Sequence, residues 1–159
     1  MKILPTALLC LLTCSPVFAN TNISDTADIP DLAGKWKTID DQTGFSRGDV
    51  LVTKNPDGTY SGKIIAIRPL PGKPLVSTCV KCKGDLKDAP FVGLRVISHF
   101  KQDPDKPLEY INGRMLDPLS GNIYRGKARL SSNGKRLVLR GYIGVSMLGR
   151  NQSWVRISD

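Results

Sequence analysis

The segment spanning residues 137–156 constrains the fold more than any other part of the chain. Apolar and polar residues alternate on both sides of a glycine-marked bend, and the segment ends in Trp154-Val155-Arg156. Alternation with a period of two is typical of half-buried β-strands, so two such runs around a glycine bend predict a hairpin. Residues 32–36 have the pattern of a first strand. We therefore expect the hairpin to close a β-barrel against this early strand.

The rest of the chain shows the same local chemistry. Turn residues over 55–58, 117–121 and 132–135 separate alternating runs, and a proline-containing stretch over 103–107 interrupts another. In the run 122–131 one face carries the basic side chains and the other the small and apolar ones. We expect strands at residues 34–40, 48–54, 59–67, 109–116, 122–131 and in the two arms of 137–156, and either a strand or a helical turn at 91–100.

These runs predict an all-β fold, a single antiparallel up-and-down barrel of about eight strands. Glycines inside strands weaken them unless they relieve bending, which the closure of a small barrel requires. Such glycines stand at positions 62, 126, 141, 144 and 149. Residues 68–90 break the alternation with four prolines and the Cys79–Cys82 pair, so we expect one long, Cys-containing ordered loop or a short helix-bearing crossover there.

The first residues indicate export. A lysine precedes an apolar run that ends in Val17-Phe18-Ala19, which fits a signal peptide over 1–19 cleaved after Ala19. Residues 20–31 are polar and aperiodic and predict a flexible lead-in, and the barrel domain is expected over 32–158. We expect a periplasmic protein. A lipid anchor at Cys14 is the competing interpretation, although Thr13 departs from the usual small residue before that cysteine.

The chain is strongly basic. Its formal net charge is +9, and removal of residues 1–19 leaves 22 basic and 14 acidic side chains. A positive field attracts polyanions, and outside the cytoplasm these are anionic lipids and polysaccharides rather than nucleic acid. An anionic membrane surface is thus one expected partner and nucleic acid is not. A charge excess that only serves solubility is the alternative. We expect a monomer.

Two resemblances follow from these motifs. Gly34-Lys35-Trp36 together with Arg156 resembles the calycin, or lipocalin-like, pattern, in which the tryptophan packs over one barrel end against the arginine. The order of motifs over about 32–157 resembles the secreted bacterial family named domain of unknown function 2147. The motifs are Gly34 to Thr38, Cys79-x-x-Cys82-x-Gly84-Asp85, Asp117-Pro-x-x-Gly121-x-x-Tyr124, Arg140 to Gly144 and Gly149-Arg-x-Gln-x-Trp154-x-Arg156. The resemblance implies a lipocalin-like barrel and an exported protein, and no established activity.

Cys79 and Cys82 form the most distinctive local pair. In an exported protein we expect them to form a disulfide that pins the long loop. A redox-active pair assisted by Lys81 and Lys83 is the alternative, and it would make the protein a thiol-disulfide oxidoreductase. Structural zinc would need two more ligands, which the sequence does not supply, and haem attachment normally needs a histidine after the second cysteine. We therefore expect no metal and no cofactor.

No catalytic constellation is evident. His99 is the sole histidine, Glu109 is the sole glutamate, and no serine has the glycine pattern of a nucleophile elbow. Asp57 and Asp117 lie in proline-glycine turns, where such side chains bond local backbone amides. We therefore assign no catalytic residue and favour a binding protein over an enzyme, with the oxidoreductase as the alternative.

Two binding hypotheses remain. In the first, the barrel holds a small lipid or apolar ligand beside Tyr124, Tyr142, Arg150, Gln152 and Trp154, while Trp36 and Arg156 pack one barrel end. An eight-stranded barrel has room for one small ligand or for its own side chains. In the second, a basic outer face docks on anionic lipid or polysaccharide. That face consists of Arg125, Lys127, Arg129, Arg136 and Arg140.

Overall fold

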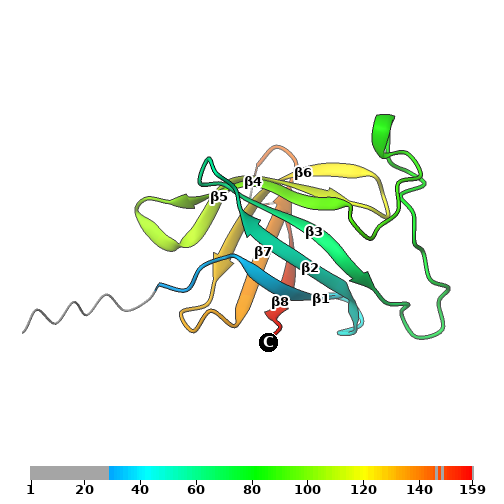
Figure 1. The fold of residues 1–159 in the computed structure, drawn as a ribbon, viewed down its shortest axis with the longest axis horizontal. Coiled ribbons are helices and arrows are strands. Elements are labelled where there is room, and N and C mark those ends of the chain that lie inside the picture. The colour runs from blue at the N-terminus through cyan, green and yellow to red at the C-terminus, as the bar shows by residue number, and fades with distance from the viewer. Residues whose placement is uncertain (1–28, 146, 148, 159) are drawn as a thin grey trace, which may run out of the picture.

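The chain folds as one closed barrel of eight antiparallel strands in sequence order (Figure 1). The computed structural model describes residues 29–145, 147 and 149–158. The elements are β1 (Gly34–Ile39), β2 (Ser46–Lys54), β3 (Tyr60–Ile67), η1 (Gly84–Leu86, a 3-10 turn), β4 (Arg95–Asp103), β5 (Lys106–Asp117), β6 (Asn122–Leu130), β7 (Arg136–Tyr142) and β8 (Arg150–Arg156). The predicted all-β up-and-down barrel is confirmed. The predicted signal peptide, the Cys14 anchor and most of the lead-in lie outside the described residues.

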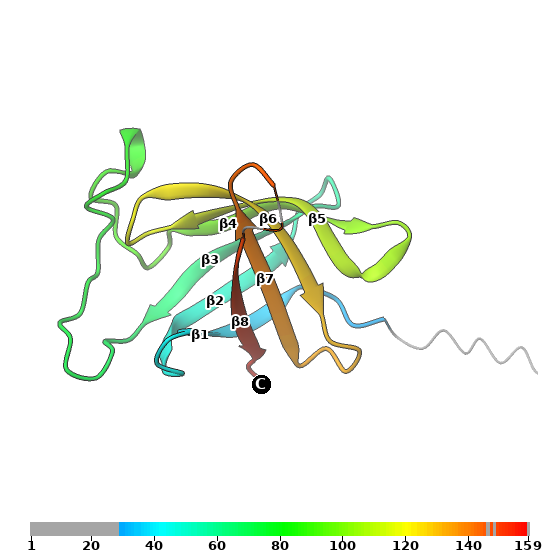
Figure 2. The same ribbon diagram turned by 180° about the vertical axis from the view of Figure 1, so that it is seen from behind.

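The barrel closes where β8 pairs with both β7 and β1 (Figure 2). The register sets Trp36 opposite Arg156 and Thr38 opposite Trp154. On the other side of β8, Leu137 lies opposite Trp154 and Leu139 opposite Gln152. Paired residues of an antiparallel sheet point to the same face, so this register sends the large side chains of β8 into the barrel. The last hairpin thus closes against the first strand, as its sequence predicts.

The local sequence explains where most strands end. Asp57 accepts hydrogen bonds from the Thr59 backbone and hydroxyl at 3.0 and 2.7 Å, which fixes the β2–β3 turn. The expected break over 103–107 is smaller than predicted, because β4 continues to Asp103 and β5 already begins at Lys106. Pro107 is tolerated at the start of β5 because the first residues of a strand need not donate to the ladder.

The predicted long Cys-containing loop is confirmed as the connection between β3 and β4. It projects from the barrel on the right of Figure 1 and carries η1 at its upper end. An isolated antiparallel bridge between Thr78 and Pro90 ties its two limbs together. Of the two alternatives for residues 91–100, the structure shows the strand, which begins at Arg95. An irregular turn precedes it, and Ile64 N of β3 donates to the Leu94 backbone oxygen of this turn at 3.0 Å.

The strand order places alternate connections at opposite barrel ends. We call the end with the β1–β2, β3–β4, β5–β6 and β7–β8 connections the mouth end, and the other the closed end. Burial of apolar side chains drives closure, at about 25 cal/mol per Å² of apolar surface. The largest fully buried side chains are Trp36, Tyr110, Phe100, Leu32, Ile97, Leu130, Leu137, Leu139, Val50, Val52 and Cys79.

Candidate functional site

Arg156 seals the closed end of the barrel. Its guanidinium carbon lies 4.3 Å from the centroid of the Trp36 ring, which is fully buried. The same guanidinium donates to the backbone oxygens of Gly134 at 2.6 Å, Ala33 at 2.7 Å and Asp31 at 2.5 Å. Burial lowers the pKa of Arg156, and the nearby Asp31 carboxylate opposes this. The structure thus gives Trp36 and Arg156 the barrel-end packing role expected from the sequence.

Two tyrosines complete this end. The Tyr60 hydroxyl donates to an Asp31 carboxylate oxygen at 3.1 Å, and the Tyr60 and Tyr110 rings meet edge-to-face at 5.3 Å. Burial and then the Asp31 carboxylate raise the pKa of Tyr60 above its usual value, so its hydroxyl remains a donor. A ligand cannot enter between these groups without breaking several hydrogen bonds.

Phe100 fills the middle of the barrel. Its ring is fully buried, and it occupies the space that side chains on two neighbouring strands would otherwise take. A Cβ atom on Gly113 would lie 2.4 Å from the ring, and one on Gly126 would lie 2.6 Å from it. The absence of side chains at these positions on β5 and β6 is therefore what lets the ring fit. This packing limits how far a ligand could reach from the mouth end.

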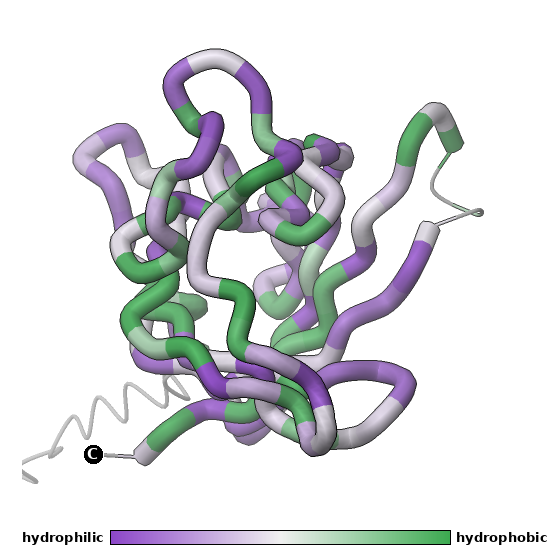
Figure 3. Tube along the Cα trace, turned by 90° about the vertical axis from the view of Figure 1, so that its right-hand side faces the viewer, coloured by the Kyte–Doolittle hydropathy of each residue, from purple (hydrophilic) through white to green (hydrophobic). Residues whose placement is uncertain are grey.

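Four of the five predicted ligand residues lie on the inner face, and three of them lie near the mouth end. Tyr124 pairs with Met115, Gln152 with Leu139, and Arg150 with the inward Gly141. Tyr124 and Gln152 are only half-buried and Arg150 is exposed, so solvent reaches this part of the inner face. Trp154, one layer deeper, is buried, and its indole Nε1 donates to Gln152 Oε1 at 3.1 Å. Figure 3 shows the barrel from this side.

The fifth predicted ligand residue lies elsewhere. Tyr142 pairs with Arg125, whose side chain is exposed on the outer face, so Tyr142 also points outward. Met115 was not among the predicted ligand residues, yet it pairs with both Ile97 and Tyr124 on the inner face and is half-buried. Alternation continued from the inward Tyr110 would place Met115 on the outer face, but a register shift between Tyr110 and Gly113 reverses the faces beyond it. The local pattern therefore carried no signal for the inward direction of Met115. The inner surface at the mouth therefore includes Met115, Tyr124, Arg150 and Gln152.

Two arginines of the predicted basic surface have side-chain partners of their own. The Arg129 guanidinium lies 3.4 Å from a Glu109 carboxylate oxygen. Arg140 donates to Asn151 Oδ1 at 3.0 Å and to the Met147 backbone oxygen at 2.7 Å. Arg125, Lys127 and Arg136 are exposed on the same outer face of β6 and β7. The five residues share one face, but two of them already have partners within the described part of the chain.

The two aspartates considered for catalysis hold turns, and His99 is exposed on the surface. The Asp117 carboxylate accepts from Leu119 N at 3.0 Å and from the Ser120 hydroxyl at 2.7 Å, so it holds the β5–β6 turn as Asp57 holds the β2–β3 turn. His99 is exposed, with a φ of 60° at an irregularity in the β3–β4 pairing, and its Nδ1 lies 3.0 Å from the Ser98 hydroxyl. No cluster of three metal-ligating side chains occurs among the described residues.

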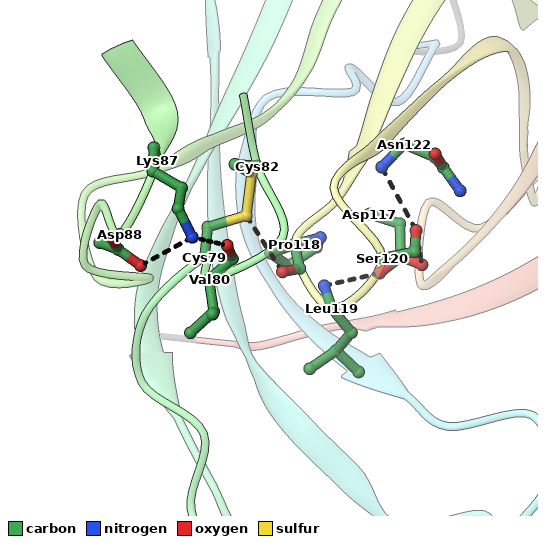
Figure 4. The surroundings of a disulfide bond; sticks show 10 residues. All are labelled: Cys79, Val80, Cys82, Lys87, Asp88, Asp117, Pro118, Leu119, Ser120 and Asn122. Atoms are coloured by element: carbon green, nitrogen blue, oxygen red, sulfur yellow. Dashed lines mark hydrogen bonds and ion pairs between the residues drawn. A yellow bond between two sulfur atoms is a disulfide. The ribbon is translucent and has the colours of Figure 1, made fainter. Parts of the chain in front are cut away.

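The predicted disulfide between Cys79 and Cys82 is present (Figure 4). The pair lies against the β5–β6 turn, where Cys79 Sγ is 3.1 Å from the Pro118 backbone oxygen. On the other side, Lys87 Nζ donates to the Val80 backbone oxygen and lies 3.5 Å from an Asp88 carboxylate oxygen. The cysteines are 0% and 4% exposed, so neither sulfur is open to a substrate disulfide in this conformation. The disulfide thus closes a small ring within the β3–β4 connection, and this ring packs against the β5–β6 turn.

Gly121 allows the β5–β6 turn to lie close to the backbone of Lys81 and Cys82. A Cβ atom there would lie 2.2 Å from the Lys81 backbone oxygen and 2.8 Å from Cys82 N. We expect Gly121→Ala to release the β3–β4 connection from the β5–β6 turn while the barrel remains folded. Limited proteolysis with mass mapping should then show cleavage within 68–94 several-fold faster than in the wild-type protein.

Gly44→Ala is the matched control. Gly44 has the same φ of 72° as Gly121, but nothing lies within 4 Å of its added Cβ. Both substitutions therefore carry the cost of a left-handed alanine, about 1 kcal/mol, and only Gly121→Ala adds the clash. Equal cleavage of 68–94 in the two variants would contradict the proposed role of the contact at Gly121.

Two hollows lie outside the barrel interior. One, of about 360 Å³, is formed by outer-wall residues of β2 and β3 together with Val92 and Gly93. The other, of about 400 Å³, is polar and contains Arg95, Ser98 and His99 beside the β2–β3 turn. Within the described chain, no helix is long and apolar enough to span a membrane.

The closed eight-stranded antiparallel barrel, with an arginine over a tryptophan at one end, has a lipocalin-like fold. The chain belongs to the family described as "Uncharacterized protein conserved in bacteria (DUF2147)", which it matches over residues 34–156. It is similar in structure to a solved protein described as "Protein HP1028 from the human pathogen Helicobacter pylori belongs to the lipocalin family". The TM-score is 0.67 at 19% identity, over 82% of this chain and 85% of that one. No curated protein matches the sequence significantly.

Proposed function

We propose that this protein is a non-enzymatic binding module that holds one small, partly apolar ligand at the inner face of the mouth end. The observation that carries the proposal is the contrast between the two barrel halves. Inward-facing Met115, Tyr124 and Gln152 are only half-buried near the mouth, whereas the layers beyond them are closed by buried side chains. Sites of this kind combine an apolar lining with a few polar groups that orient the ligand.

The side chains at the mouth favour a ligand with an anionic head group. Arg150 is exposed at the rim, and a guanidinium binds carboxylate or phosphate through paired hydrogen bonds. The Tyr124 hydroxyl and the Gln152 amide offer further donors and acceptors beneath it. Phe100 fills the barrel below this level, so the apolar part of the ligand must be short. A short- or medium-chain acyl group or a compact apolar molecule fits these limits.

An envelope location is part of the proposal. The predicted signal peptide over residues 1–19 supports export. The Cys79–Cys82 disulfide is also typical of oxidising compartments outside the cytoplasm.

Tryptophan fluorescence offers a direct test with fatty acids of increasing chain length. The two tryptophans of the chain are buried, and Trp154 bonds to Gln152, so a ligand at Gln152 should change the Trp154 emission. We expect short and medium chains to bind more tightly than long ones. Arg150→Gln should weaken binding of a carboxylate by about tenfold, which corresponds to about 1.4 kcal/mol.

The chain supplies matched controls for this experiment. Arg125→Gln and Tyr142→Phe alter the same residue types on the outer face and should leave the affinity unchanged, whereas Tyr124→Phe should reduce it. Native mass spectrometry of protein recovered from its source gives an independent measurement. A ligand-free mass, together with no fluorescence response to any chain length, would rule out the binding function.

A further inference from the structure

The exposed apolar side chains of this protein are concentrated at the mouth end. All four connections there carry at least one large apolar residue that is 36% exposed or more. Three lie on the β7–β8 connection, where Ile143 is 71%, Val145 61% and Met147 88% exposed. The others on these connections are Phe45, Leu75, Val76, Val80, Leu86, Val92 and Leu119. Figure 3 shows the β7–β8 hairpin projecting from the barrel with apolar residues at its end.

The connections at the closed end have the opposite character, and the exposed Ile29 at this end belongs to the lead-in. The three connections consist of residues 55–59, 104–105 and 131–135, and their sequences are Asn-Pro-Asp-Gly-Thr, Pro-Asp and Ser-Ser-Asn-Gly-Lys. None of them contains a large aliphatic or aromatic side chain. Exposed apolar residues scattered singly over a surface need no explanation, but their segregation to one end of a barrel does. The sequence of the mouth connections therefore points to contact with an apolar environment.

The longest mouth connection is also basic, whereas the β1–β2 connection carries Asp40 and the exposed Asp41. The β3–β4 connection, residues 68–94, contains five basic and two acidic side chains. Lys73, Lys81 and Lys83 are exposed there, as is Arg150 at the rim. The Asp40 carboxylate in the β1–β2 connection is already bound by Arg47 at 3.1 Å. The mouth end thus combines exposed apolar tips with exposed cations.

We propose that the mouth end docks on an anionic phospholipid bilayer, with the apolar tips in the interface and the lysines on lipid phosphates. Interfacial burial is not directional, so apolar tips on separate connections can each contribute. Lysines close to an anionic surface add about 1 kcal/mol each. The cores of protein–protein interfaces are instead depleted in lysine, which argues against a protein partner for this end.

Two of the docking connections are held in place before they meet the membrane. The disulfide and the Thr78–Pro90 bridge order the β3–β4 connection. The Asp40 carboxylate accepts from Thr43 N at 2.9 Å and from the Thr43 hydroxyl at 2.8 Å, which fixes the connection that carries Phe45. Little conformational entropy is therefore lost on docking. This docking does not require a ligand in the barrel, so it can fail or succeed independently of the binding function.

Flotation with vesicles tests the proposal. We expect the purified protein to bind vesicles of phosphatidylcholine and phosphatidylglycerol, and to bind pure phosphatidylcholine at least tenfold more weakly. High salt should reduce the binding without abolishing it, since the apolar contribution persists. The triple variant Ile143→Ser, Val145→Ser, Met147→Ser should lose about tenfold or more in vesicle affinity.

Two sets of control variants localise the surface. The triple variant Leu51→Ser, Ile65→Ser, Val155→Ser removes three exposed apolar side chains from the outer barrel wall and should bind as the wild-type protein does. The double variant Lys81→Glu, Lys83→Glu should weaken vesicle binding. The double variant Arg125→Glu, Lys127→Glu on the lateral basic face should weaken it less. Thermal melts of each variant confirm that the barrel is folded.

A spectroscopic reporter completes the test. Phe45→Trp should show a blue-shifted emission with anionic vesicles, and the two native tryptophans are buried and contribute a constant background. Three results would overturn the proposal. The first is that the wild-type protein does not float with anionic vesicles. The second is that the β7–β8 tip variant floats as the wild-type protein does. The third is that the lateral basic variant loses more vesicle affinity than the Lys81 and Lys83 variant.

Discussion

Replacing Arg156 with alanine is expected to lower the free energy of unfolding by about 3 kcal/mol. The substitution removes the donor from three backbone oxygens, those of Asp31, Ala33 and Gly134, all within 2.7 Å of the guanidinium. It also uncovers one face of the Trp36 ring, which the guanidinium covers at 4.3 Å. Carbonyl groups that lose their partner in a partly buried site carry the desolvation cost without compensation, so the loss exceeds that of an ordinary surface arginine.

Urea denaturation followed by tryptophan fluorescence measures this effect, because Trp36 reports directly on the closed end. Arg156→Lys should recover little of the stability, since an ammonium group cannot bond three separate carbonyls in the planar geometry of a guanidinium. Arg150→Ala is the matched control on the same strand and the same inner face, and it should change the unfolding free energy by less than about 0.5 kcal/mol. Similar losses in the two alanine variants would contradict the sealing role of Arg156.

The second large effect is expected at Gly113 in β5. An alanine Cβ at this position would lie 2.4 Å from the Phe100 ring, which is fully buried and has no room to withdraw. Overpacking of this kind costs about 1–3 kcal/mol, and we expect Gly113→Ala to lose about 2 kcal/mol. Gly126→Ala should lose less stability. Only one of the three atoms nearest to its Cβ belongs to the ring, and the other two belong to the flexible Met115 side chain.

Gly141→Ala separates this clash from the general effect of removing a strand glycine. Gly141 lies on the same inner face, but its Cβ would meet its nearest neighbour, Tyr124, at 3.5 Å, an ordinary contact. We expect Gly141→Ala to be neutral or slightly stabilising, because alanine restricts the unfolded chain. Thermal denaturation of both variants provides the measurement. Phe100→Leu should make Gly113→Ala less costly, a coupling that a double-mutant cycle detects. Additive losses would show that Phe100 is not the cause.

The strand pattern follows from the sequence alone. Alternation along 122–131 already separates the outward Arg125 and Lys127 from the inward Ala128 and Leu130, and the structure agrees. Turn chemistry at 55–58 and 117–121 fixes the hairpins, since the local aspartates bond the turn amides regardless of what packs around them. The same alternation, followed from Leu137 and Leu139, also assigns Tyr142 to the outer face.

The contacts that set the depth of the inner site and the position of the β3–β4 connection could not be predicted in this way. The depth of the inner site depends on Phe100 meeting Gly113 and Gly126, which come together only when β4, β5 and β6 take their register. The disulfide contacts the β5–β6 turn across 39 residues, and Arg140 bonds to Asn151 across a hairpin. A local pattern determines which face a side chain takes. Barrel closure determines which side chains then share a layer, because register and shear are properties of the whole sheet.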